Sequence, residues 1–115
     1  MNSPEAARAG VRAVAAYRPD FIKAFTDGWR YSNAADNSSM DEETLAALVD
    51  EAHRHGLKVF SHTVMVKRGK VAARAGVDVI AHSVQDMPVD AELVRLMREH
   101  GTAYAPSLAV YLPAR

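Results

Sequence analysis

The sequence contains no cysteine. Disulfides and thiolate metal ligands are therefore excluded, and the composition fits a reducing compartment, so we expect a cytoplasmic protein. Its 14 basic and 14 acidic residues cancel, and no basic stripe favours binding to nucleic acid or to a membrane surface. No apolar run approaches the length of a transmembrane span, and Arg8 and Arg12 interrupt the N-terminal segment where a signal peptide would be apolar.

What the sequence does contain is enough apolar material for one folded unit. Hydrophobic residues make up 49% of the 115 positions, which excludes intrinsic disorder. A chain of this length builds one domain at most. We therefore predict a single, partial domain over residues 1–115.

Four segments have helical patterns. Residues 3–17 begin with a serine cap and a first-turn proline, and Ser39 followed by Glu42 predicts a capping box for the second helix. A shorter helix is expected in "VKRGKVAARAG", and Pro88 is expected at the start of the last one. The second, third and fourth helices should stop at Gly56, Gly76 and Gly101.

A short apolar run follows each helix: "DFIKAF", "LKVFSH", "VDVIAHSV" and "TAYAPSLAVYL". Such runs suit strands of a parallel sheet. The order α-β-α-β-α-β-α-β predicts an α/β fold with four units of a parallel (β/α)8-type barrel, which is half a barrel. A small doubly wound sheet is the alternative, although no glycine-rich fingerprint supports a nucleotide site.

One spacing recurs along the chain. Six residues separate Gly56 from His62, Gly76 from His82, and Gly101 from Ser107. Because the carboxyl ends of parallel strands meet at one edge, His62 and His82 are expected to be neighbours. Two imidazoles there can share one metal ion. The alternative is that each is a half-buried histidine with a structural hydrogen bond.

Lys23 interrupts the first apolar run. Alternation places it on the same face as Phe21 and Phe25, where a lysine must lose its charge, find a partner or be modified. The alternative is an edge-strand lysine whose stem reaches solvent.

Other polar and aromatic residues are candidates for lining a substrate pocket. Asp27, Trp29 and Tyr31 follow the first strand, whereas Tyr104 and Ser107 belong to the fourth. Ser107 is not predicted to be a nucleophile, because no His–Asp partner is visible nearby in the sequence. The remaining histidines, at helix ends, are predicted to be structural. They are His53, His55 and His100.

Four motifs in order resemble the central part of amidohydrolase-superfamily enzymes, in particular the imidazolonepropionase- and prolidase-like group. They are "DFIKAFTDG", "EAHRHGLKVFSHT", "AARAGVDVIAHSV" and "LMREHGTAYAPSL", and they cover nearly the whole chain. The resemblance implies a (β/α)8 barrel with divalent metal, zinc above all, at the strand tips. It equates Lys23 with a lysine that is often carboxylated on its amine, and His62 and His82 with metal-binding histidines of the next two strands.

The same resemblance exposes departures. The family's first-strand His-x-His pair and eighth-strand aspartate have no counterpart, so the chain corresponds to barrel strands four to seven. What remains is a three-ligand site of Lys23, His62 and His82, which we also predict to be the catalytic residues. Three ligands with an open position are typical of catalytic zinc. The resemblance thus implies a hydrolase in which metal-activated water attacks the carbonyl of a small-molecule amide or ester.

Two alternatives remain open at this point. One is an inactive, truncated amidohydrolase fragment that only folds and oligomerises. The other is a metal-free hydrolase that uses His62 or His82 as its base.

Assembly is predicted on physical grounds. Four strands cannot close a barrel, because about eight are needed. The open inner face is expected to expose apolar residues such as Phe21, Phe60, Ile80 and Tyr104. We therefore predict a homodimer or higher homo-oligomer, in which the first strand of one copy pairs with the fourth strand of another.

Overall fold

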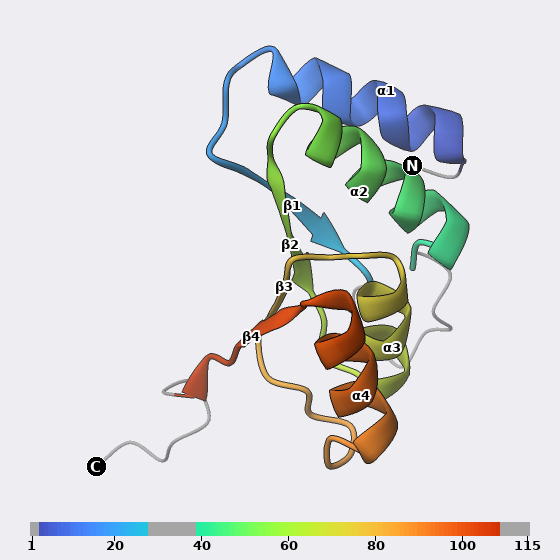
Figure 1. Cartoon of the computed structure of the whole chain (residues 1–115), viewed down its shortest axis with the longest axis vertical. Coiled ribbons are helices and arrows are strands. Elements are labelled where there is room, and N and C mark those ends of the chain that lie inside the picture. Colours follow the sequence, from blue (N-terminus) through green and yellow to red (C-terminus); the bar gives the residue numbers. More distant parts are fainter. Residues whose placement is uncertain (1–2, 28–38, 109–115) are drawn as a thin grey trace.

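The computed structural model describes residues 3–27 and 39–108 (Figure 1). Helices and strands alternate as predicted: α1 Pro4–Ala15, β1 Phe21–Phe25, α2 Glu42–Arg54, β2 Lys58–His62, α3 Val66–Arg74, β3 Val79–Ala81, α4 Ala91–His100 and β4 Ala103–Ala105. No helix in this part of the chain is both long and apolar enough to cross a membrane.

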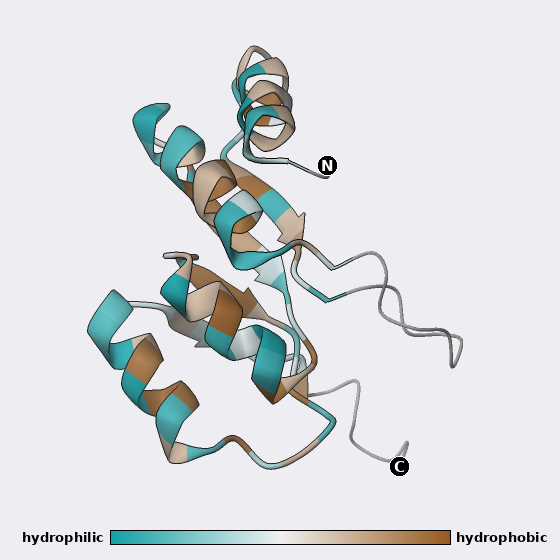
Figure 2. Cartoon of the chain, turned by 90° about the vertical axis from the view of Figure 1, so that its right-hand side faces the viewer, coloured by the Kyte–Doolittle hydropathy of each residue, from teal (hydrophilic) through white to brown (hydrophobic). Residues whose placement is uncertain are grey.

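The four strands form one parallel sheet in the order β1-β2-β3-β4. All four helices lie on one face of this sheet, side by side in chain order (Figures 1 and 2). A doubly wound fold would place helices on both faces. The arrangement is that of half a (β/α) barrel, so the predicted fold class is confirmed.

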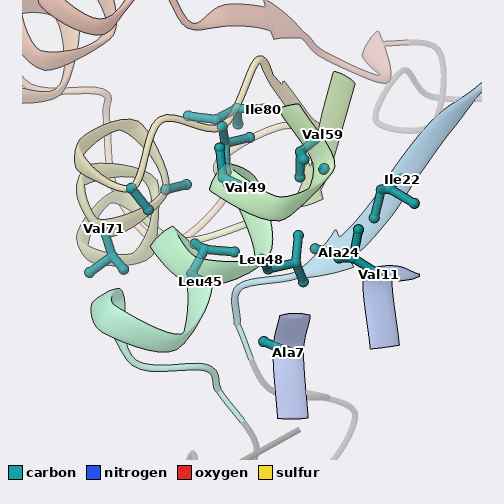
Figure 3. Close-up of a cluster of buried hydrophobic side chains, with 14 of the residues drawn as sticks. Ala7, Val11, Ile22, Ala24, Leu45, Leu48, Val49, Val59, Val71 and Ile80 are labelled. Atoms are coloured by element: carbon teal, nitrogen blue, oxygen red, sulfur yellow. The ribbon is translucent and has the colours of Figure 1, made fainter. Parts of the chain in front are cut away.

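The core lies between the sheet and the helices (Figure 3). Alternate residues of β1 are buried, with Ile22 and Ala24 facing the helices while their neighbours are exposed. The helices contribute the complementary apolar face, in which Leu45 and Leu48 of α2 are fully buried. The buried residues of β1 alternate along the strand, and those of α2 recur with the helical period. Both sets belong to one hydrophobic cluster.

Two predicted helix starts are wrong. The cap of α2 is Asp41, whose side chain accepts a hydrogen bond from the Thr44 backbone N–H at 2.7 Å, so Ser39 does not open the helix. The cap of α4 is Asp90, which accepts from the Leu93 N–H at 2.9 Å, so the helix begins after Pro88. In both cases an aspartate nearer the helix satisfies the free N–H groups of the first turn.

The prediction for the open face is right for the phenylalanines and wrong for Ile80, whereas Tyr104 is exposed as predicted, at 39%, but on the other face of the sheet. Phe21 and Phe60 lie on the face without helices, with ring centroids 4.5 Å apart. Ile80 is fully buried, and its register partner in β4 is Tyr104, which shares its face. The reason is the register: Ile80 also pairs with Ser61, a buried residue on the helix side of β2.

Candidate functional site

His62 and His82 meet at the carboxyl end of the sheet, but not through equivalent strand positions. The register partner of His62 is Ala81, so His82 lies one residue beyond β3. Strict alternation would turn His82 toward the helices, on the side of Ile80. Instead its backbone adopts a left-handed conformation, with φ of 75°. The two imidazoles then come together, with ring centroids 4.7 Å apart.

This backbone conformation at His82 is uncommon for a residue with a side chain. It costs roughly 1–2 kcal/mol in an L-residue, and such costs concentrate at functional sites. The left-handed backbone directs the side chain of His82 to the open face of the sheet, where it contacts His62 and Lys23.

Lys23 reaches the same point from β1. It lies on the exposed face of the strand, and its Nζ is 3.3 Å from His82 Nε2. The two residues are 59 positions apart in the sequence. The three side chains that the sequence singled out as metal ligands are thus brought together.

The environment of His82 favours its neutral form. Burial lowers the pKa of this imidazole, and the nearby Lys23 and His62 lower the pKa further. A neutral imidazole keeps a lone pair for a metal or a proton. When Lys23 donates to Nε2, the ring proton of His82 lies on Nδ1, which faces Ser107 Oγ at 3.4 Å. Ser107 then accepts a hydrogen bond and is not activated as a nucleophile.

His62 lies between an aromatic ring and a carboxylate. Its ring stacks on Phe25 with centroids 4.9 Å apart, and its Nε2 is 3.6 Å from Asp27 Oδ1. The side chain of His62 is 25% exposed, so it is only partly buried.

The burial of Asp27 beside His62 was not predicted from the sequence. Its side chain is fully buried, one oxygen accepts a hydrogen bond from the Val64 N–H at 2.6 Å, and the other has no hydrogen-bond partner among the described residues. Burial raises the pKa of this carboxyl, against the opposing effects of Val64 and His62. A buried carboxylate oxygen without a partner is costly, so it marks a position where a bound group would be stabilising.

The other candidates lie elsewhere or outside the described residues. Tyr104 is on the helix side of the sheet, where its hydroxyl accepts a hydrogen bond from the Val84 N–H at 2.8 Å. Trp29 and Tyr31 fall outside the described ranges. Of the remaining histidines, His53 contacts Asp78 with an Nε2–Oδ2 distance of 2.8 Å, a partnership within the fold that suits a structural role.

The residues at the strand tips suit a divalent metal. Among the described residues, no three His, Cys, Asp or Glu side chains are already arranged as a metal site. The donor set nevertheless has the right chemistry, because imidazole nitrogens and a carboxylate oxygen are zinc ligands. The oxygen of Asp27 that lacks a partner is the observation that supports the fit.

Replacing Asp27 with asparagine is expected to change how stability depends on pH. Because burial raises its pKa in the folded chain, the unfolded chain releases this proton at a lower pH. The stability contributed by the protonated carboxyl is present below its ordinary value of 3.8 and is lost as the pH rises through the raised value. Asparagine has no such loss, so the stability of Asp27→Asn relative to wild type should increase with pH across that window.

Urea denaturation at a series of pH values measures this difference. Asp86→Asn is the matched control, since Asp86 is an exposed carboxylate that also accepts a backbone N–H, from Val66 at 2.9 Å. Parallel stability curves for wild type and Asp27→Asn would contradict the assignment of Asp27 as a costly buried carboxyl.

Solved structures provide the comparison with known proteins. The chain matches a Xaa-Pro dipeptidase with methionine bound in its active site at 32% identity and a TM-score of 0.81, over 95% of this chain and 27% of the dipeptidase. It matches a prolidase complexed with N-methylphosphonate-L-proline at 29% identity and a TM-score of 0.79, over 94% and 26% of the two chains. An ochratoxinase from A. niger matches at 27% identity and a TM-score of 0.76, over 90% and 23%.

These matches cover nearly all of this chain but only about a quarter of each solved structure. Another solved structure, an amidohydrolase, matches over 93% of this chain at 29% identity and a TM-score of 0.76. Neither a protein-family model nor a curated protein matches the sequence. The resemblance predicted from the motifs is thus confirmed by structure: this chain has the fold of four consecutive βα units of an amidohydrolase-type barrel.

Proposed function

We propose that this chain is a metal-dependent hydrolase of the amidohydrolase type, acting on the carbonyl of a small-molecule amide or ester. The observation that carries the proposal is the convergence of Lys23, His62 and His82, which requires the left-handed backbone at His82. The hydrolase class is supported by the structural neighbours, among them a dipeptidase and a prolidase.

Each residue has a distinct role in this proposal. His62 and His82 hold the metal through ring nitrogens, and the neutral state of His82 near pH 7 keeps its lone pair available. Zinc is the favoured ion, because the donors are imidazoles and carboxylates. A bound divalent ion of this kind polarises a carbonyl and lowers the pKa of water to about 7.

Lys23 and Asp27 complete the set. Carboxylation of the Lys23 amine would convert a cation beside His82 into an anionic oxygen ligand, which removes the repulsion between Lys23 and a metal. Asp27 faces His62 Nε2 at 3.6 Å, from where its free oxygen either orients that ring or joins the ligands. Phe25 stacks on His62 and restricts the ring's rotation.

One observation favours a metal-free hydrolase as a second candidate. The Asp27 carboxylate lies beside His62 Nε2, and a carboxylate in that position can hold the imidazole as a general base. In that case hydrolysis would persist after all metal has been removed. We also propose that the protein is cytoplasmic, which imaging of a fluorescently tagged chain in cells would test.

Activity before and after chelation distinguishes the candidates. The 115-residue chain would be assayed on a dipeptide amide and an activated ester as purified, after dialysis against a chelator, and after zinc is restored. We expect hydrolysis that is lost on chelation and recovers with zinc. Undiminished hydrolysis in the metal-depleted protein would favour the His62 base, and no hydrolysis under any condition would support the inactive fragment.

A further inference from the structure

In the part of the chain that the structure describes, the two outer helices, α1 and α4, each have one flank without a neighbouring helix. Along the helical layer α1 packs on α2 and α4 packs on α3, so α1 and α4 lie at opposite ends (Figures 1 and 2). At the corresponding ends of the sheet, β1 and β4 each have one edge that pairs with no other strand of the described residues. The exposed surfaces at these two ends are both largely apolar.

At the α4 end there is an apolar groove. A cavity of about 570 Å³ lies between α4 and the strands β3 and β4, with Val84, Val89, Val94, Met97 and Tyr104 among its lining residues. Val94 is 37% exposed and Tyr104 is 39% exposed, although both face this cavity. Apolar side chains around a concave surface of this kind are typical of a docking site.

At the α1 end the free flank is apolar and uncharged. Val14 of this flank is 48% exposed, Tyr17 in the turn after the helix is 88% exposed, and Ala6 and Ala13 of the helix are exposed as well. The basic residues of α1 point the other way, since Arg8 and Arg12 form ion pairs with Asp50 and Glu51 of α2. The flank of α1 that has no helical neighbour is thus apolar, as is usual for a helix surface that packs against another helix.

The repeat of the fold indicates what the groove accommodates. The described residues form four helix–strand units, and each unit after the first places its helix beside the preceding helix and its strand beside the preceding strand. A unit added after α4–β4 would bring its helix to the groove and its strand to the edge of β4. We propose that this unit is α1–β1 of a second copy, so that the groove receives the apolar flank of the partner's α1.

Charge supports this pairing. Asp20 directly precedes β1, and Arg98 lies in the last turn of α4, at one end of the groove. Both positions lie at the amino ends of the strands, because α4 runs back toward the start of β4. Neither residue has an ion-pair partner within residues 3–27 and 39–108. In the proposed pairing Asp20 of one copy approaches Arg98 of the other, and the relation is reciprocal.

A single substitution in the groove tests the proposal. In Val94→Arg a long charged side chain fills the groove, whereas Met87→Arg places the same residue at an apolar position, 55% exposed, that does not line it. Light scattering with size-exclusion chromatography would compare both with wild type. We expect wild type and Met87→Arg at twice the 12.5 kDa mass of one chain, and Val94→Arg at 12.5 kDa with unchanged circular dichroism. A monomeric wild type, or a Val94→Arg protein that still dimerises, would overturn the proposal.

Charge reversal tests the orientation independently. Asp20→Arg and Arg98→Asp each place like charges together across the interface, and each is expected to raise the dimer dissociation constant at least about fivefold at low salt. The double variant restores opposite charges and should regain most of the wild-type affinity. Within one copy the two residues lie at opposite edges of the sheet, so mutual rescue reports a contact between copies. Additive weakening in the double variant would overturn the proposed orientation.

Discussion

A chain in which both His62 and His82 are replaced by alanine is expected to lose affinity for zinc by more than about two orders of magnitude. Even the outer partners of metal ligands are typically worth about 10–100-fold in affinity, and this change removes two direct ligands. His62 and His82 lie with ring centroids 4.7 Å apart, and no other pair of histidine rings in the described residues makes such a contact. Titration calorimetry with zinc measures the loss.

The matched control is the double variant His53→Ala and His55→Ala. It removes the same number of imidazoles from the end of α2, where these side chains are 45% and 41% exposed. Zinc affinity should be unchanged in the control. Tight binding of one zinc by the His62 and His82 double variant would place the site elsewhere in the chain.

The second large effect is expected on turnover. If the chain hydrolyses an amide or ester, His62→Ala and His82→Ala should each lower kcat by about 10²–10⁴-fold, which is the range typical of a catalytic group. His82→Asn is the more decisive change, because asparagine tolerates the left-handed backbone that His82 adopts while lacking the imidazole. Its fold should survive, and its turnover should fall as far as that of the alanine variant.

His100→Asn controls for the substitution itself, at a histidine that lies exposed in the last turn of α4. Steady-state kinetics and circular dichroism would be measured together for all variants. Full turnover in a well-folded His82→Asn protein would show that this histidine is structural and that the family resemblance misleads at this position.

The fold was largely predictable from local signals. Gly56, Gly76 and Gly101 all have positive φ values, as expected of residues that follow the end of a helix. A glycine at each helix end, followed by an apolar run, was sufficient to predict the alternating units. The caps were less predictable, because Ser39 and Asp41 both lie near the start of α2 and only the backbone geometry selects Asp41.

The residues of the candidate site could be predicted from the sequence, but the way in which they come into contact could not. The equal spacing of His62 and His82 from their glycines suggested equivalent positions, yet the register pairs His62 with Ala81. The contact between His62 and His82 depends on the left-handed backbone at His82. No sequence pattern predicts this conformation for a histidine. Asp27 was recognised as a residue near the site, but its buried, unpaired oxygen depends on the packing of the loop around Val64.

The most direct test of the proposed centre is the position of a bound ion. Crystals of the zinc-loaded 115-residue chain, with data collected across the zinc absorption edge, would locate the metal by its anomalous scattering. The account predicts a peak at the carboxyl end of the sheet, about 2.0–2.1 Å from ring nitrogens of both His62 and His82. A peak at His53 and Asp78 alone, with none between His62 and His82, would contradict it.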